Sequence, residues 1–229
     1  MLERSELLAL IERDSWLAEL AEASRAACAS DPAHDIEHCL RVARWAVRIG
    51  EPRGVDRREA IAAALLHDVV NVAKSSPDRA RASELCAARA RELCEGHLPA
   101  QAVDRIADAI RDHSHSRGAR PESPLGEALQ DADRLEGLGA LGILRCVSTG
   151  ARMGADYFDP DDPWAERREL DDRAHSVDHF YRKLLSVAET MCTDVGRAEA
   201  DRRTRFLRAF LAELATELGE PQSQRATIR

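Results

Sequence analysis

A histidine–aspartate pair directly follows an apolar run in this chain. The run is Ile61-Ala62-Ala63-Ala64-Leu65-Leu66, and the pair is His67-Asp68. An imidazole and a carboxylate at the edge of a core cost several kcal/mol unless hydrogen bonds or a cation compensate. A divalent metal ion is the simplest compensation, so the pair predicts a helical core built around a metal site.

Further residues of metal-ligand type lie in two other helix-like segments. His34 and His38 are spaced i, i+4 and share one helix face, whereas Asp131 and Asp133 diverge by about 200° around a helix. Two histidines and two aspartates together suit Mn, Fe, Co, Ni or Zn. The alternative interpretation is an α-helical bundle with scattered core and surface polar residues.

Composition favours helices over sheets. Aromatic residues make up 4% of the chain and apolar residues 44%, with alanine and leucine dominant beside many arginines and glutamates. No window alternates β-branched and polar residues with the period of a strand. We therefore predict an all-α protein, with helices at about 3–29 (one or two), 34–50, 56–70, 78–95, 99–113, 176–193 and 196–218. A further helix is predicted from Leu125, and a glycine-containing run (Gly137, Gly139, Gly142) leads on from it to about 152.

Two segments are predicted to be irregular. Residues 116–124 contain Gly118, Pro121 and Pro124, and residues 153–174 are acidic and interrupted by prolines. Long ordered loops of the second kind are often functional. The polar residues from Glu220 onward are predicted to be a disordered tail.

Charge and cysteine usage limit the partners and the compartment. The formal net charge is −8 and the pI is about 5.5, which disfavours a duplex nucleic acid binder but allows a small phosphorylated substrate held with a metal. The six cysteines lack C-x-x-C spacing and are predicted to be reduced. The N-terminal residues resemble no signal peptide, and no apolar stretch is long enough for a bilayer, so we expect a cytoplasmic protein without membrane contact.

An ordered series of segments resembles the HD-domain metal-dependent phosphohydrolases, specifically their YedJ/YpgQ-like branch. The series carries the H…HD…D signature of His38, His67-Asp68 and Asp133, and it extends from about residue 30 to 215. The matching segments are His34-Asp-x-x-His38-x-x-Arg41-Val42, Leu65-Leu66-His67-Asp68, Val69-Val70-Asn71-Val72-Ala73-Lys74, Ala109-Ile110-x-x-His113-Ser114, Gln130-Asp131-Ala132-Asp133-Arg134-Leu135-Glu136 and Asp178-His179-Phe180-Tyr181-x-Lys183-Leu184-Leu185.

The resemblance implies one helical HD domain over residues 30–219, with residues 1–29 as a helical segment packed on it and residues 220–229 as a tail. It also implies one divalent ion, which could be Mn, Co, Ni, Fe, Zn or Mg. Its ligands would be His38 rather than His34, Asp133 rather than Asp131, and the pair His67-Asp68.

The resemblance also suggests roles for residues around the metal. Relatives that hydrolyse (p)ppGpp or 5′-nucleotides carry an acidic residue three or four positions after the HD pair, where this chain has Asn71 and Val72. Asp35 or Asp131 is then a candidate general base, and Asp131 otherwise a supporting or helix-capping residue. The candidate catalytic residues are His34, Asp35, Asp68 and Lys74. The candidate substrate-binding residues are Lys74, Asn71, His113 and Arg134.

The implied activity is hydrolysis of a small phosphorylated substrate, a nucleoside or deoxynucleoside phosphate, by a monomer or homodimer. A metal with open coordination positions would activate water and polarise a phosphoryl oxygen. Two alternatives stay open. One is a phosphodiesterase acting on cyclic or oligonucleotide substrates, in which histidines such as His34 and His113 build a second metal site. The other is a non-catalytic sensing or regulatory HD module, which the missing acidic residue would favour.

Overall fold

The computed structural model of the protein describes residues 2–27, 35–72, 76–114 and 118–221. Within these ranges the regular elements are α-helices and short 3-10 helices, and the β-pairing found there is one isolated bridge between Asp156 and His175. The predicted all-α fold class is therefore confirmed. None of the helices in these ranges is long and apolar enough to cross a membrane.

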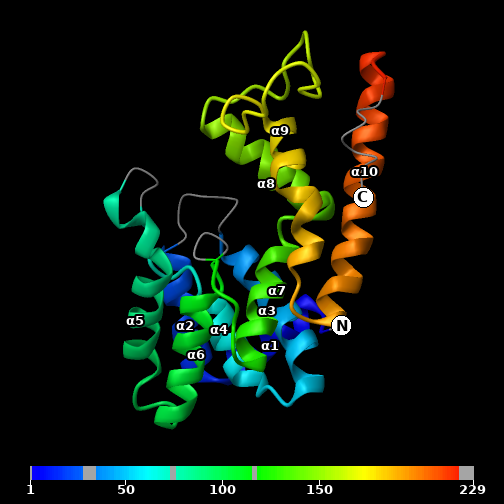
Figure 1. Cartoon of the computed structure of the whole chain (residues 1–229). Coiled ribbons are helices and arrows are strands. Elements are labelled where there is room, and N and C mark those ends of the chain that lie inside the picture. Colours follow the sequence, from blue (N-terminus) through cyan, green and yellow to red (C-terminus); the bar gives the residue numbers. More distant parts are fainter. Residues whose placement is uncertain (1, 28–34, 73–75, 115–117, 222–229) are drawn as a thin grey trace. The chain divides into compact units, whose positions relative to one another are not determined.

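The chain forms two compact units, residues 1–133 and 134–229. The predicted division at residues 29 and 219 stays a prediction. The elements of the first unit are α1 (Arg4–Arg13), α2 (Ser15–Ala27), α3 (Ile36–Gly50), η1 (Glu51–Arg53), α4 (Arg57–Leu66), η2 (Pro77–Arg81), α5 (Ala82–Cys94), α6 (Ala100–Asp112) and most of α7 (Pro124–Leu135). The α-helices among them are labelled in Figure 1. The second unit contains α8 (Gly139–Arg152), α9 (Ser176–Arg182), η4 (Leu184–Thr190) and α10 (Asp194–Leu218).

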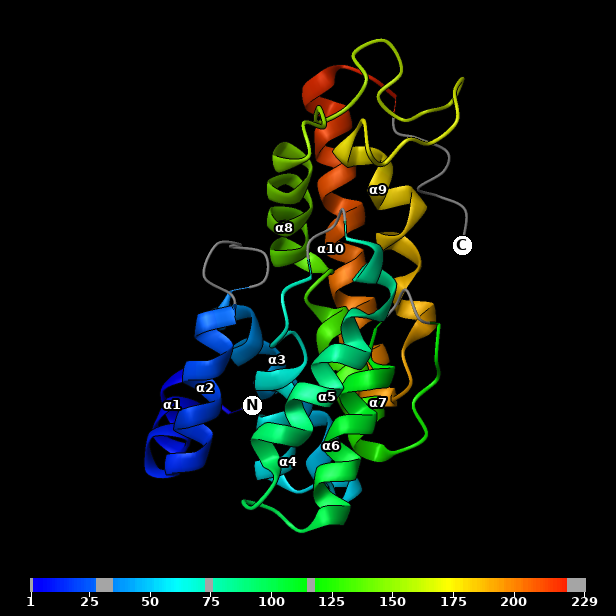
Figure 2. The ribbon, with the colours of Figure 1, turned by 90° about the vertical axis from the view of Figure 1, so that its left-hand side faces the viewer.

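Helix α4 is the central element of the first unit. Its residues from Glu59 to Leu66 are all buried, and α4 packs against α2, α3, α5 and α6 (Figure 2). A helix that is apolar on every side has to be enclosed by other helices. The small side chains of Ala60, Ala62, Ala63 and Ala64 let these neighbours approach closely. The residue that follows this helix, His67, consequently lies deep inside the unit.

Helices α3 and α6 each place one apolar face against this centre. In α6 the buried residues Ala102, Val103, Ile106, Ala107 and Ile110 follow the spacing of a single helix face. Helix α3 buries a wider face, on which His38 lies in the first turn. Both helices therefore direct residues near one of their ends toward the end of α4.

Three helices are shorter than their periodicity predicts. Helix α4 ends at Leu66 rather than near residue 70. The helix predicted from Leu125, with the glycine-containing run that follows it, is divided into α7 and α8, and Gly139, the first residue of α8, has a φ of +70°. The predicted helix over 176–193 is interrupted at Lys183, where the backbone leaves the helical region before η4 begins.

In the second unit, α10 packs against α8 and η4, and α9 packs against α8 and η4. Thr193 caps the start of α10, and Gly219 ends it in the left-handed conformation. The side chain of Arg203 contacts Gly139 and donates a hydrogen bond of 2.6 Å to the carbonyl of Leu135. These contacts attach α10 to the start of α8.

The acidic loop over residues 153–175 is held by a buried ion pair. Asp178 is fully buried and accepts two hydrogen bonds from the guanidinium of Arg168, one of them 3.0 Å long. The same carboxylate accepts the backbone N–H of Asp171 at 2.7 Å. Since Asp178 belongs to α9, this network ties the middle of the loop to a helix, and the loop is ordered by internal contacts.

The described cysteines differ in burial. Cys39, Cys86 and Cys94 are buried, and Cys146 and Cys192 are partly exposed. The predicted core position therefore holds for Cys39, Cys86 and Cys94 but not for Cys146 and Cys192, and Cys28 lies outside the described residues.

Candidate metal centre

His38 is positioned by the start of α3. Asp35 is the N-cap of this helix, and its Oδ1 accepts a hydrogen bond of 2.8 Å from the backbone N–H of His38. A capping carboxylate satisfies an N–H that the helix itself leaves without a partner, and this stabilises the first turn. The imidazole of His38 is fully buried and points to the end of α4.

His67 is positioned by the end of α4, where it is the C-cap residue. Its Nδ1 lies 2.7 Å from the carbonyl oxygen of Ala64. A carbonyl oxygen can only accept, so the neutral ring carries its hydrogen on Nδ1 and keeps a lone pair on Nε2. Metal-binding histidines are commonly oriented by this kind of second hydrogen bond. His67 is therefore held as a nitrogen ligand before any cation binds.

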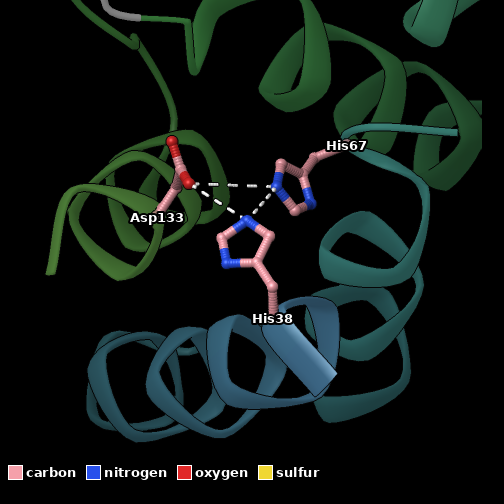
Figure 3. A group of neighbouring side chains, drawn as sticks. All are labelled: His38, His67 and Asp133. Carbon is pink, nitrogen blue, oxygen red and sulfur yellow. Dashed lines mark hydrogen bonds and ion pairs between the residues drawn. The ribbon is translucent and has the colours of Figure 1, made fainter. Parts of the chain in front are cut away.

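The three side chains His38, His67 and Asp133 converge on one point, as Figure 3 shows. The Nε2 atoms of the two histidines are 3.2 Å apart. Oδ1 of Asp133 lies 3.5 Å from Nε2 of His38 and 3.9 Å from Nε2 of His67. Two nitrogens that share an ion at about 2.1 Å are about 3.0–3.4 Å apart, so the spacing of the imidazoles fits a transition metal.

Asp68 lies beside this group, with Oδ2 at 3.5 Å from Nε2 of His67. Burial would raise the pKa of its carboxyl, but the neighbouring imidazoles of His67 and His113 outweigh that effect and hold the pKa below its usual value. Asp68 is therefore ionised at neutral pH. Together with Asp133 it supplies two negative charges, which match the charge of a divalent cation.

His113 repeats the arrangement of His67 at the end of α6. It is the C-cap residue, it is buried, and its Nδ1 lies 2.6 Å from the carbonyl oxygen of Ile110. Its ring meets the ring of His67 edge to face, with centroids 5.1 Å apart. Burial is the main cause that lowers the pKa of His113, so the ring is neutral at pH 7.

The structure separates the two aspartates of α7. Asp133 has 27% of its side chain exposed and faces the imidazoles, whereas Asp131 is fully buried. Among the described residues, two groups have ligand atoms close enough to share an ion; one of them contains Asp133, and neither contains Asp131. The geometry thus agrees with the choice of Asp133, while its role as a ligand stays a prediction.

Other candidate residues have different surroundings. Asp35 uses its carboxylate to cap α3, Asn71 is exposed, and Arg134 donates a hydrogen bond to the backbone carbonyl of Thr190. His34 and Lys74 lie outside the described residues. The structure therefore brings Asp68 and His113 to the imidazole cluster and assigns Asp35 and Arg134 contacts that support the fold.

One residue near the site was not predicted to have a role. The amide of Gln130, which is 1% exposed, donates hydrogen bonds to the carbonyls of Asp112 and Ala119 at 3.0 and 3.1 Å. Gln130 precedes Asp133 by one helical turn, and Asp112 directly precedes His113. The sequence signal was its place in a matching motif, but both acceptors are backbone atoms, which sequence patterns do not identify.

Comparison with known proteins assigns this arrangement to a family. The HD domain family model matches residues 35–138, which include all four predicted ligands. YpgQ of Bacillus subtilis, an uncharacterized protein, is 32% identical over 190 residues, which cover 81% of this chain and 84% of YpgQ. The chain therefore belongs to the HD domain family, and YpgQ is a relative within it, which confirms the predicted resemblance.

Solved structures agree with this assignment. The crystal structure of Bacillus subtilis YpgQ in complex with ADP matches with a TM-score of 0.69 and 28% identity, covering 89% of this chain and 95% of YpgQ. An HD-superfamily hydrolase from Bacillus thuringiensis matches with a TM-score of 0.65 and 27% identity, covering 89% of this chain and 97% of the other. The chain is thus a member of a superfamily of hydrolases.

Proposed function

We propose that this protein is a metal-dependent phosphohydrolase that acts on nucleoside or deoxynucleoside phosphates. The observation that supports this proposal most directly is the buried pair of Nε2 atoms 3.2 Å apart, with an aspartate oxygen 3.5 Å from one of them. At this distance the two nitrogens either share a proton in a hydrogen bond or bind one cation, because two facing lone pairs would repel each other. A hydrolase that binds a divalent cation accounts for both imidazoles and for the carboxylates.

His38, His67, Asp68 and Asp133 would hold the ion. Bound there, a divalent cation supplies charge that polarises a phosphoryl oxygen and makes a water molecule more acidic. His38 and His67 contribute neutral nitrogens whose orientation is set by the ends of α3 and α4. Asp68 remains ionised, so its carboxylate can accept a hydrogen bond from a water molecule as well as bind a cation.

The nucleotide substrate is proposed from the relative and from charge. YpgQ was crystallised with ADP, whose phosphates carry the negative charge that a divalent cation attracts. The chain itself has a net charge of −8, so the positive charge for a phosphate has to be local. His113 and Asn71 are proposed to contact the substrate, along with His34, Lys74 and Arg134 as further candidates.

A phosphodiesterase acting on cyclic or oligonucleotide substrates is the second candidate function. The observation that favours it is the position of His113, whose nitrogen and the carboxylate of Asp68 are close enough to bind a further cation. The two functions differ in the bond that is hydrolysed, which is a phosphate bond of a nucleoside phosphate in the first and a phosphodiester bond in the second.

The experiment is a hydrolysis panel with the full chain. Nucleoside mono-, di- and triphosphates and cyclic dinucleotides are incubated with Mn²⁺, Co²⁺, Ni²⁺ or Mg²⁺, and the products are identified by chromatography. We expect release of phosphate or pyrophosphate from nucleotides by the wild type and its loss in Asp68→Asn, which keeps the size of the side chain. Asp201→Asn, on the exposed side of α10, is the matched control and should retain activity.

The outcomes discriminate among the alternatives. Cleavage of cyclic dinucleotides alone would favour the phosphodiesterase. No turnover with any metal, in a protein that still retains a bound ion, would refute the hydrolase proposal and favour a sensing or regulatory module.

A further inference from the structure

Helix α10 exposes one side along most of its length. The other side packs against α8 and η4, and it buries residues such as Ala200, Leu207 and Leu211. Figure 1 shows α8 and α9 together on one side of α10. At 3.6 residues per turn, the residues opposite to the buried ones form a continuous strip. This outer face of α10 contains Val195, Ala198, Arg205, Phe206, Ala209 and Glu213, all of which are exposed.

Four residues of the outer face are apolar. Phe206 is 50% exposed and Val195 is 39% exposed, and the small residues Ala198 and Ala209 lie on the same strip. A single exposed apolar side chain is ordinary on a protein surface. A row of them, on a helix whose opposite side is already buried, is a second apolar strip of the kind that contacts another helix.

The two charges of the outer face lie on either side of Ala209. Arg205 precedes Ala209 by about one helical turn, and Glu213 follows it by about one turn. Among the described residues, neither side chain has a hydrogen-bond or ion-pair partner. The outer face is therefore basic before Ala209 and acidic after it, which makes it complementary to its own reversed copy.

We infer that the outer face of α10 binds a second copy of this chain, as an antiparallel helix pair with a two-fold axis at Ala209. Each copy places Arg205 opposite Glu213 of the other, so the symmetry forms this ion pair twice. A parallel pair would set like charges against each other, which disfavours that orientation. Burial of Phe206 supplies the attraction, and the small Ala209 lets the helices approach. This inference is independent of the proposed function and selects the homodimer from the predicted monomer or homodimer.

The test is sedimentation velocity of the full chain, which separates monomer from dimer by size. One helix from each copy makes a small interface, at the low end of the range for specific complexes. We therefore expect a reversible dimer with a dissociation constant of micromolar order, observed between about 1 and 100 µM protein.

Exchange of the two charges tests the antiparallel pairing. Arg205→Glu and Glu213→Arg each create two like-charge contacts, so each variant alone should raise the dissociation constant by more than about 10-fold. An equimolar mixture of the two variants should form a heterodimer, because every charge then lies opposite its complement. Arg173→Glu is the matched control, since Arg173 is exposed in the loop before α9, and it should dimerise like the wild type.

Three results would overturn the inference. They are a wild type that stays monomeric up to about 100 µM, a dimer that both charge variants leave unchanged, or folded charge variants whose mixture stays monomeric. Circular dichroism establishes folding, and glutamate and arginine are both good helix formers. If a charge variant does not fold, Phe206→Ser decides in its place, because a dimer through this face has to weaken when the ring is lost.

Discussion

The side-chain amide of Gln130 donates a hydrogen bond of 3.0 Å to the backbone carbonyl of Asp112, the residue before His113. A second hydrogen bond from the same nitrogen reaches the carbonyl of Ala119. Gln130 lies on α7 one turn before Asp133, so it connects the helix that carries this candidate ligand with the end of α6, where His113 lies. These two hydrogen bonds hold α7 against the end of α6.

Replacing Gln130 with alanine should destabilise the protein. The change removes the amide that satisfies two carbonyls, and an unsatisfied buried group costs about 1–3 kcal/mol in the free energy of unfolding. Urea denaturation measures this loss. Gln101→Ala, on the exposed face of α6, is the control and should change the unfolding free energy little. Equal stability of the two variants would mean that the hydrogen bonds of Gln130 contribute nothing net.

Replacing Asp35 with alanine should weaken metal binding as well as the fold. Loss of an N-cap costs about 1 kcal/mol, and in this case the released backbone N–H belongs to His38. Asp56→Ala is a matched control, since Asp56 caps the start of α4 by the same kind of hydrogen bonds, at the opposite end from His67. Both variants should lose similar stability, but only Asp35→Ala should lower Mn²⁺ affinity in calorimetry. Equal affinities would contradict the positioning role of Asp35.

Replacing Asp178 with alanine should destabilise the second unit and spare the metal centre. The change leaves the guanidinium of Arg168 without its buried carboxylate. Because 22% of the Arg168 side chain is exposed, water can partly replace this carboxylate and reduce the loss of stability. We expect a loss of about 3 kcal/mol, the lower end of the range for a broken buried pair. Urea denaturation and Mn²⁺ titration of the same variant provide the check. Unchanged stability, or loss of Mn²⁺ binding from folded protein, would contradict this account.

Stability should fall in acid partly through Glu199. Burial by itself raises the pKa of this carboxyl. The hydrogen bonds from Arg202 and Arg203 have a larger and opposite effect, so the pKa falls from its ordinary 4.5 to about 2. A group with a lowered pKa stabilises the fold above its unfolded pKa, and this stabilisation is lost as the pH falls from 4.5 toward 2. Because solvent screens the charges of Glu199 and the two arginines, Glu199 should contribute about 1 kcal/mol to the free energy of unfolding.

The measurement for Glu199 is urea unfolding at several pH values between 6 and about 3. Glu199→Gln should be less stable than the wild type at pH 6, and the difference should shrink as the pH approaches 3. A difference that stays constant with pH would show that the charge of Glu199 does not stabilise the fold.

Much of the candidate site could be predicted because its residues stand at helix ends with local signals. The apolar run before His67 identifies a buried helix, and Asp35 is a capping residue type at the correct distance from His38. Helix boundaries were less predictable. The continuous helix expected over 176–193 is broken at Lys183, and no local residue type requires that break.

The sequence by itself determined the helical class, the buried character of α4 and the set of histidines and aspartates that can bind a metal, because these follow from residue type and periodicity. Only the tertiary structure decided which members of that set meet. Periodicity states the direction of a side chain around its own helix but not the distance to another helix. The 3.2 Å between His38 and His67, and the approach of His113 to Asp68, depend on how closely α3 and α6 pack against the alanines of α4.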